Sequence, residues 1–405
     1  MTDTPAPPER QRAVRNVAVL ATMSAVQGAQ MPVYIVLGGL SGAILADDKS
    51  LATLPIAFQM LTGMATAVPM SLFMGRYGRK AGFWLGGGLA SFAGIFAALA
   101  MLRGDFWLLC FGYMFAGVYQ STQGYFRFAA TDTAPDDFKP KAISLVLAGG
   151  LVAALLSAEI VSRTDGLFSA VPFVGAYLFL VVPNLLGMAL TCLLDIPKPS
   201  RSVQTTPSRP WSEILADRNI PVAMLCAMFV YGTMTLTMTS TPLAMVACGF
   251  GTPDAADVVK WHVVAMFAPS FFTGSIIARV GARPVIAVGL ILLLGCCAVA
   301  LSGIEIHDFY LALILLGLGW NFGYIGATSL LAAHHRPEDR AKVQGMNDFL
   351  VMAMMATAAL SSGKLMATGG WSFVVLAVMV PVAIAGMALL YGTLLARRER
   401  VAGRA

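Results

Sequence analysis

Bulky polar side chains recur at helical spacing inside segments that are otherwise apolar. Between residues 106 and 131, Tyr113, Gly117, Gln120, Gly124 and Arg127 are separated by four, three, four and three positions, so they share one face of a helix. Such a face can hydrogen-bond a small solute and stack on a planar ring. We expect the substrate-binding residues to be Gln27, Gln30, Tyr113, Tyr119, Gln120, Gln123, Trp320, Asn321 and Tyr324. The alternative is that these groups only join helices, by hydrogen bonds worth roughly 0.6 kcal/mol each.

Side chains that could hold a metal or carry out covalent catalysis are not arranged for either task. The six cysteines and four histidines show no spacing typical of a metal site, and the adjacent Cys296 and Cys297 fit packing better than chemistry. The sequence contains no Gly-x-x-x-x-Gly-Lys-Ser/Thr loop to bind nucleotide phosphates. We therefore expect neither an enzyme nor a bound cofactor.

The composition shows what kind of element must position these polar residues. Of 405 residues, 58% are hydrophobic and 12% are charged, and the mean hydropathy is +0.75. A soluble domain carries about 25% charged residues, so half of the polar surface that water requires is missing. The shortage indicates that lipid covers most of the exterior.

Apolar runs long enough to cross a bilayer recur along the chain. A spanning helix needs roughly 20 mostly apolar residues. Runs of this kind lie near 17–43, 51–74, 82–102, 106–131, 142–163, 172–194, 219–247, 256–277, 284–304, 308–332, 343–363 and 371–396. We expect an all-α integral membrane protein with twelve transmembrane helices.

The hydrophilic segments divide the chain and orient it. The expected parts are a tail (1–16), a six-helix bundle (17–194), a linker (195–218), a second six-helix bundle (219–396) and a second tail (397–405). Most Lys and Arg residues lie in the tails, the linker and the even-numbered loops, which predicts that both termini and the linker are cytoplasmic. The net charge of +6 reflects this bias and requires no nucleic-acid partner.

The two predicted bundles repeat each other in sequence. Arg76, Gly78 and Lys80 follow the second run, and Arg279, Gly281 and Arg283 follow the eighth, 203 residues or about half the chain later. Gly117 and Gly124 of the fourth run match Gly319 and Gly326 of the tenth. Duplicated six-helix halves are typical of transporters that expose a central site alternately to each side.

These motifs resemble the major facilitator superfamily, whose loop between spans two and three reads Gly-x-x-x-Asp-Arg-x-Gly-Arg-Arg/Lys. The matching residues are Arg76, Gly78, Arg79 and Lys80 in the first half and Gly274, Arg279, Gly281 and Arg283 in the second. Ser71, Gly75, Ala278 and Ala282 depart from the motif, and the missing acid at Gly75 puts the usual charge lock of this loop in doubt. The resemblance implies two pseudo-symmetric six-helix bundles, with spans 1, 4, 7 and 10 lining a cavity.

A finer resemblance is to a bacterial riboflavin-transporter branch. It rests on the stretches 125–132, 141–150, 319–322 and 347–349. The aromatic residues near the expected cavity suit a planar ring.

Charged residues inside the spans are candidates for gating and proton coupling, because an unpaired charge near the bilayer centre costs at least ~2.5–3.5 kcal/mol. Arg127 and Asp348 lie at matched depth in opposite halves, and we expect them to attract across the cytoplasmic mouth; alternatively, Arg127 snorkels and Asp348 caps its helix. The resemblance brings spans five and eight together, so Glu159 would meet Lys260 and His262 in a latch released by protonation. A solvated cluster is the alternative.

The expected function is secondary active transport by alternating access, as proton-coupled uptake of a small organic solute such as riboflavin. The Gly-Pro signature of antiporters is missing from span five, where Gly149 and Gly150 lead to Ser157 and Ala158. That absence favours import, with drug or metabolite efflux and a transporter-like sensor as the alternatives. We expect a monomer in the bacterial inner membrane, with lipid, a solute and a proton as partners.

Overall fold

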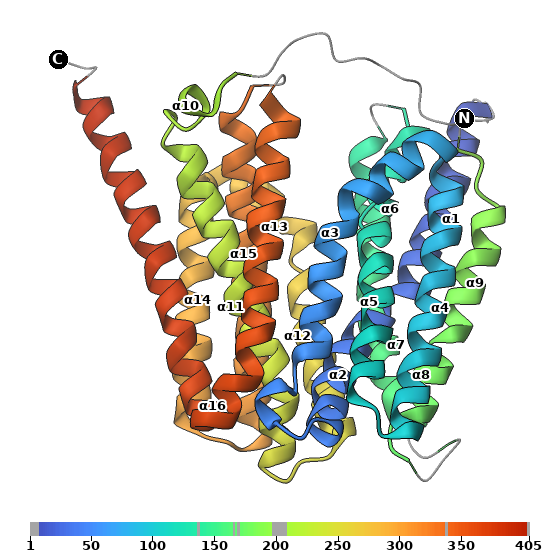
Figure 1. Ribbon diagram of the computed structural model, residues 1–405. Helices are drawn as coiled ribbons and strands as arrows, with labels where there is room; N and C mark the ends of the chain where they lie inside the picture. Colours follow the sequence, from blue (N-terminus) through green and yellow to red (C-terminus); the bar gives the residue numbers. More distant parts are fainter. Residues whose placement is uncertain are drawn as a thin grey trace, which may run out of the picture. The chain divides into compact units, whose positions relative to one another are not determined.

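The computed structural model describes residues 8–135, 138–164, 167, 171–196, 209–336 and 339–402, and every regular element within them is a helix (Figure 1). Parts of the expected tails (1–7 and 403–405) and linker (197–208) lie outside the described residues. The chain divides into two compact units. The first is Met1–Arg201 with Thr252–Lys260, and the second is Ser202–Gly251 with Trp261–Ala405.

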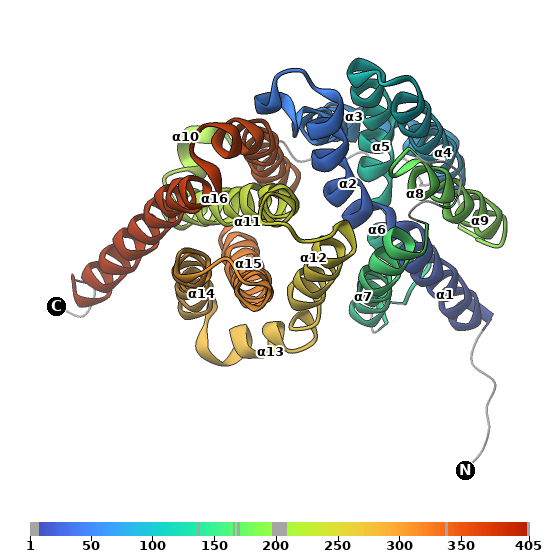
Figure 2. The same cartoon turned by 90° about the horizontal axis from the view of Figure 1, so that it is seen from below.

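The first unit is built from long apolar helices with short breaks. They are α1 (Pro8–Gly28), α2 (Gln30–Leu45), the 3-10 helix η1 (Lys49–Leu51), α3 (Leu54–Tyr77), α4 (Arg79–Arg103), α5 (Phe106–Gln123), α6 (Phe126–Asp132), α7 (Lys139–Thr164), α8 (Val174–Phe179) and α9 (Val181–Cys192). Helices α1 and α2 form the expected first span, α5 and α6 the fourth, and α8 and α9 the sixth. Helix α5 packs between α3 and α4, and α1 packs on α7 (Figure 2).

Helix α1 begins at Pro8, nine positions before the expected span. Its first turns are held by polar contacts that an apolar pattern does not reveal. Arg12 forms an ion pair with Asp195 at 2.9 Å, and Asn16 donates a hydrogen bond to the Asp195 carbonyl oxygen at 2.8 Å. The end of the sixth span therefore supports the start of the first.

The second unit contains the remaining spans. Its helices are α10 (Trp211–Ile214), α11 (Asn219–Ala247), α12 (Thr252–Phe267, shared with the first unit), α13 (Ser270–Val280), α14 (Ala282–Ser302), α15 (Ile306–His334) and α16 (Arg340–Ala402). Helix α11 packs on α15 and α16, and α14 packs on α15.

Helix α16 carries the two last spans. Its backbone bends at Gly370 (φ 66°, ψ −164°), between the predicted runs 343–363 and 371–396. Nine helical stretches in the described part of the chain are long and apolar enough to cross a membrane, and Lys342–Leu394 is one of them. That stretch holds spans 11 and 12, while α5 with α6 and α7 supply spans 4 and 5, which completes the expected twelve.

Two glycines make the same turn in the two halves. Gly78 separates α3 from α4 with φ 95° and ψ 159°, and Gly281 separates α13 from α14 with φ 87° and ψ 163°. A positive φ with ψ near 160° is open essentially to glycine alone. The matched conformations support the internal repeat.

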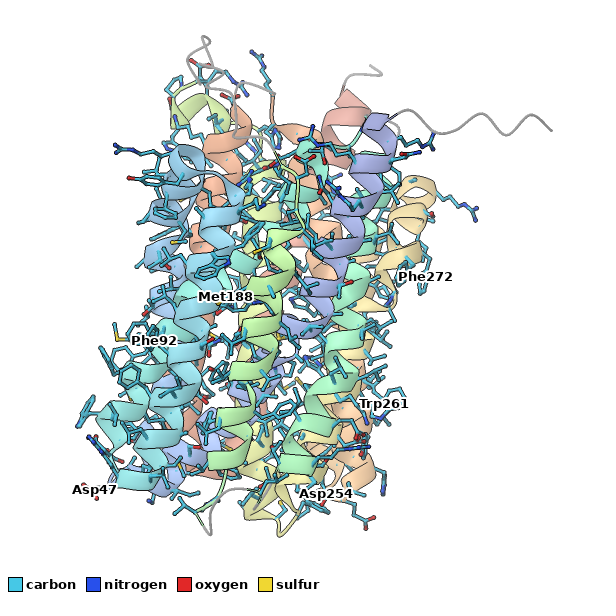
Figure 3. All side chains as sticks on the ribbon, turned by 90° about the vertical axis from the view of Figure 1, so that its right-hand side faces the viewer. Asp47, Phe92, Met188, Asp254, Trp261 and Phe272 are labelled. Carbon is cyan, nitrogen blue, oxygen red and sulfur yellow. The ribbon has the colours of Figure 1, made fainter. Side chains whose placement is uncertain are left out.

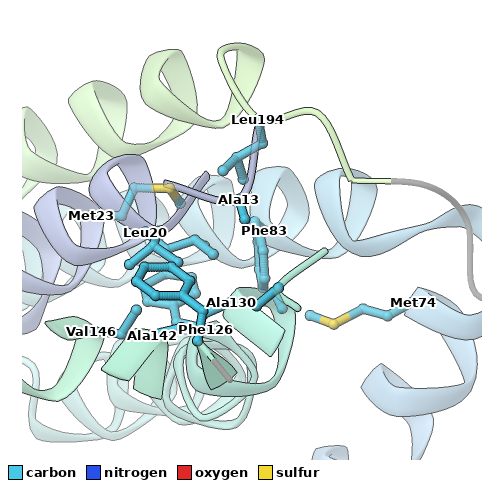
Figure 4. Close-up of a cluster of buried hydrophobic side chains, with 14 of the residues drawn as sticks. Ala13, Leu20, Met23, Met74, Phe83, Phe126, Ala130, Ala142, Val146 and Leu194 are labelled. Atoms are coloured by element: carbon cyan, nitrogen blue, oxygen red, sulfur yellow. The ribbon is translucent and has the colours of Figure 1, made fainter. Parts of the chain in front are cut away.

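Apolar side chains occupy both the interior and the exterior. One buried cluster joins α1, α3, α4, α6 and α7 through residues such as Leu20, Met74, Phe83 and Phe126 (Figure 4). On the outside, large apolar side chains such as Phe92 and Phe272 project from their helices (Figure 3). An apolar exterior of this kind suits lipid.

Candidate substrate site and gating residues

The break in the first span is lined by amides. Helix α1 ends at Gly28 and α2 begins at Gln30. Gln30 Nε2 donates to Asn184 Oδ1 at 3.0 Å, and Asn184 Nδ2 donates back to Gln30 Oε1 at 3.2 Å, so this pair joins α2 to α9. Gln27 packs on α9, since a Cβ at Gly187 would lie 2.0 Å from its amide carbon. No described residue forms a hydrogen bond with Gln27 Oε1.

The fourth span carries further polar groups without partners. Among the described residues, the buried Tyr119 hydroxyl and Gln120 Oε1 have no hydrogen-bond partner. Gln120 lies beside Gly63 of α3, whereas Gln123 lies beside Gly28 of α1. The expected substrate-binding amides of spans 1 and 4 therefore lie in one unit. Three polar atoms there can still accept a hydrogen bond: Gln27 Oε1, the Tyr119 hydroxyl oxygen and Gln120 Oε1.

Tyr113 is part of a closed hydrogen-bond network. It is fully buried with Tyr34 and Tyr177, and its hydroxyl lies 2.9 Å from that of Tyr177 and 3.0 Å from the Tyr34 carbonyl oxygen. Ser41 Oγ extends the network from Tyr177 at 2.9 Å. Tyr113 therefore links spans 1, 4 and 6 and has no open side in this arrangement.

An aromatic cluster forms in the second unit around Trp320. The Trp320 ring stacks on Tyr324 with centroids 5.2 Å apart and planes at 19°, and Tyr231 meets both rings edge-on at 5.3 and 5.0 Å. Phe267 approaches Trp320 at 6.0 Å. Within the part of the chain that the structure describes, the buried Trp320 Nε1 donor has no partner. These four residues, from α11, α12 and α15, are called the aromatic cluster below.

Asn321 has every polar group of its side chain occupied by neighbours. Its Nδ2 donates to the Met266 carbonyl oxygen at 2.6 Å and to Ser270 Oγ at 2.7 Å. Its Oδ1 accepts from Thr273 Oγ1 at 2.7 Å, and the residue is fully buried. Asn321 thus ties span 10 to span 8, next to the ring of Trp320.

The predicted polar stripe of span 4 is interrupted. Helix α5 ends at Gln123 and α6 begins at Phe126, so Arg127 is on a different helix from Tyr113 and Gln120. Arg127 is exposed, with its guanidinium 4.9 Å from the centre of the Phe128 ring. Asp348 is also exposed but belongs to the second unit, so its pairing with Arg127 stays a prediction.

The expected latch residues have local partners. Glu159 pairs with Arg163 at 2.7 Å, and Lys260 forms an ion pair with Asp257. His262 is fully buried, donates from Nδ1 to the Leu313 carbonyl oxygen at 2.9 Å, and finds no partner at Nε2 among the residues described. The latch between Glu159 and the other two residues stays a prediction.

The loop motif of the first half has an acid from elsewhere in the chain. Arg79 Nε pairs with Asp132 Oδ2 at 3.0 Å, and both side chains are mostly buried. Asp132, at the end of α6, provides the acid that the motif lacks at Gly75. Lys80 Nζ donates to the Leu194 carbonyl oxygen at 2.9 Å, and Arg76 lies over the Tyr77 ring.

The loop motif of the second half is bonded differently. Arg283 donates to the Asn219 side chain, its Nε has no partner, and Arg279 is exposed. Asn219 lies 203 positions after Asn16, as Arg283 does after Lys80. Both halves thus anchor the first residues of their bundle near the loop, through different bonds.

Some polar residues of these clusters were not predicted. Asn184 and Gln59, whose Oε1 has no partner, each lie buried inside an apolar run. The argument applied to Gln27 and Gln30 would have selected both. Phe267 carries no such signal, because one phenylalanine in an apolar run is ordinary.

Comparisons with known proteins agree on one family. Residues 18–269 match the family described as Major Facilitator Superfamily. The riboflavin transporter RfnT of Brucella anthropi is 38% identical over 360 residues, which cover 88% of this chain and 90% of that protein. The uncharacterized MFS-type transporter YdeG of Bacillus subtilis is 26% identical over 379 residues, covering 89% and 88%.

Solved structures share the fold. The nucleoside transporter NupG aligns with a TM-score of 0.71 at 13% identity, covering 93% of this chain and 99% of that one. The xylose transporter XylE from E. coli aligns with a TM-score of 0.69 at 11% identity, covering 94% and 97%. These likenesses confirm the expected architecture of twelve transmembrane helices in two six-helix bundles.

Proposed function

Because this chain belongs to the Major Facilitator Superfamily and is a membrane transporter, we propose that it imports riboflavin or a closely similar planar compound. The observation that carries the proposal is the 38% identity with the riboflavin transporter RfnT over most of both chains. The two-bundle fold supports transport by alternating access. The chain is not an enzyme, since its family and relatives are transporters.

The chemistry of both polar regions supports this substrate. Riboflavin joins a planar, heteroaromatic ring to a hydroxylated chain. The aromatic cluster supplies ring faces for stacking and, at Trp320 Nε1, an unused donor for a ring oxygen or nitrogen. The unpartnered oxygens of Gln27, Gln120 and Tyr119 can accept hydrogen bonds from hydroxyl groups. Gln123 and Tyr324 adjoin these groups and are proposed as further contacts.

Tyr113, Gln30 and Asn321 have a supporting role in this proposal. Each is held by hydrogen bonds to neighbouring helices and lies beside a residue with an unused group. We propose that Gln30, three positions after Gln27, and Asn321, directly after Trp320, position those two residues, and that Tyr113 holds span 1 against spans 4 and 6.

Uptake by purified protein in liposomes tests the substrate. We expect saturable entry of radiolabelled riboflavin that unlabelled riboflavin inhibits and an equal concentration of xylose does not. Counterflow with riboflavin loaded inside should accelerate entry. Absence of counterflow with riboflavin, in liposomes that retain folded protein, would refute the substrate.

We further propose that protons drive uptake and that Glu159, Lys260 and His262 take part in the coupling. An inward-directed proton gradient should then raise the initial rate of entry. Glu159→Gln and His262→Gln should each weaken that stimulation, whereas Asp47→Asn, at an exposed turn, serves as the control (Figure 3). If the gradient has no effect on the wild-type protein, the coupling proposal is wrong while the substrate proposal stands.

The gating proposal concerns Arg127 and Asp348. We expect Arg127→Asp and Asp348→Arg to impair uptake singly and to restore part of it together. A double variant no better than the worse single variant would argue against an attraction. We also propose that the protein is a monomer in a bacterial inner membrane and that both of its termini are cytoplasmic.

A further inference from the structure

A groove runs along the membrane-facing side of the second unit between α14 and the last span of α16. Its volume is about 730 Å³. Its wall includes Arg283, Ala287, Leu290, Ile291, Leu390 and Thr393. Ile291 and Leu390 are 65% and 60% exposed, so the groove is open toward the outside of the bundle. Both ribbon views show the C-terminal part of α16 leaning away from the rest of this unit (Figures 1 and 2).

One end of the groove is basic, and the remainder is apolar. Arg283, at the second position of α14, lines the groove and donates to the Asn219 side chain, while its Nε–H is buried and has no acceptor among the described residues. The exposed Arg279 lies in the last turn of α13, on the other side of Gly281. A guanidinium group binds phosphate oxygens through parallel N–H donors. From Arg283 to Ile291 the helix rises about 12 Å at 1.5 Å per residue, which gives an apolar path leading away from the charge.

The equivalent place in the first half is a smaller hollow. Lys80 and Trp84 stand 203 positions before Arg283 and Ala287. Around them the hollow measures about 290 Å³, and Trp84 occupies the place of the smaller Ala287. Lys80 is also engaged, since its Nζ donates to the Cys192 and Leu194 carbonyl oxygens at 3.2 and 2.9 Å. The duplicated fold therefore does not by itself require a groove at this position.

We infer that the groove of the second half binds an anionic phospholipid. Arg283 holds the phosphate of the headgroup, and an acyl chain lies along Ala287, Leu290 and Leu390. The positive charge of Arg283 favours an anionic headgroup. The apolar length of the groove favours a lipid over a soluble phosphate. On the topology predicted from the Lys and Arg distribution, this lipid belongs to the cytoplasmic leaflet.

Native mass spectrometry of the full-length protein in detergent tests the inference, with palmitoyl-oleoyl phosphatidylglycerol and the matching phosphatidylcholine as probes. The two informative variants are Arg283→Gln and Ala287→Trp, the second of which copies the residue that the first half carries. Lys80→Gln is the matched control in the smaller hollow of the first half. A basic residue near the headgroups contributes about fivefold in affinity, so we expect Arg283→Gln to reduce bound phosphatidylglycerol by about that factor.

Ala287→Trp should reduce the binding of both lipids, and Lys80→Gln should reduce neither. Arg283→Lys should restore part of the preference for phosphatidylglycerol. Equal retention of phosphatidylglycerol by the wild-type protein, Arg283→Gln and Ala287→Trp would overturn the inference. So would complete displacement of the lipid by glycerol phosphate, because the site would then recognise a free phosphate. None of these outcomes depends on riboflavin transport.

Discussion

Gly78 and Gly281 adopt nearly the same backbone conformation at positions 203 residues apart, with φ of 95° and 87° and ψ of 159° and 163°. Each glycine lies between the second and third spans of its half. Since a side chain is strained in this region whatever space surrounds it, the shared glycine records the duplication more directly than the charged residues beside it.

We expect Gly78→Ala and Gly281→Ala each to destabilise the protein by about 1–3 kcal/mol. Thermal unfolding of the purified protein in detergent measures the loss. Gly75→Ala and Gly274→Ala are the matched controls, since a Cβ at either position meets no atom within 4 Å and their helical backbone accepts alanine. Equal stability of the Gly78 and Gly75 variants would contradict the argument from strain.

Asp339 lies in the second half, near the linker. Its carboxyl group should make the stability of the protein depend on pH. Burial alone would raise the pKa of its carboxyl group, but hydrogen bonds from the Arg209 backbone and side chain, with the charges of Arg209 and Arg336, lower the pKa below its ordinary 3.8. A lowered pKa means that the stabilisation is complete above that ordinary value and is lost as the pH falls through the folded-state pKa.

Accordingly, Asp339→Asn should lower the unfolding temperature at pH 7, and the difference from the wild-type protein should shrink below about pH 4. Asp47→Asn, at an exposed turn, controls for removing a carboxylate. A difference between Asp339→Asn and wild type that stays constant down to pH 3 would show that the carboxylate charge is not the cause.

Trp320 should contribute to substrate affinity through its ring. Losing one stacked aromatic contact costs about 0.5–1.5 kcal/mol, so Trp320→Ala should raise the KM for riboflavin uptake by about two- to tenfold. Trp107→Ala, on an exposed tryptophan, is the control. An unchanged KM in a folded Trp320→Ala protein would remove the aromatic cluster from the proposed site.

Asn321 should contribute mainly to the packing of helices rather than to substrate binding. Its three short hydrogen bonds to Met266, Ser270 and Thr273 join spans 8 and 10, and Asn321→Ala removes all three. We expect a loss of about 1–3 kcal/mol in thermal unfolding. A variant of wild-type stability with a raised KM would instead identify Asn321 as a direct contact of the substrate.

The pattern of apolar runs predicted the fold well, because membrane helices must satisfy their own backbone and announce themselves by length. Helix ends were harder. The start of α1 at Pro8 depends on contacts of Arg12 and Asn16 with Asp195, and the break between α5 and α6 at Gly124 depends on local backbone geometry. Periodicity assumes an unbroken helix, so it assigned Arg127 to the face of Tyr113.

The sequence predicted which types of residue form the candidate site, but predicted less well what each residue does there. Amides in apolar runs do gather in the first half, but sequence cannot distinguish the occupied amide of Asn321 from the unoccupied oxygen of Gln120. The difference is made by partners such as Ser270 and Thr273, which are close in space and about fifty positions away in sequence. For the same reason the pairing of Arg79 with Asp132 could not be read from the loop motif alone.

The bend at Gly370 has a mechanical consequence for the transport cycle. Spans 11 and 12 meet at that residue with no loop between them, and the next residue, Trp371, donates from Nε1 to the Ala300 carbonyl oxygen of α14 at 3.1 Å. The Gly370 end of span 11 is therefore held to span 9 by the residue that follows it. When span 11 tilts, it must either rotate about this point or move span 12 with it. A flexible stretch of glycine and serine inserted after Gly370 would give span 11 independent motion.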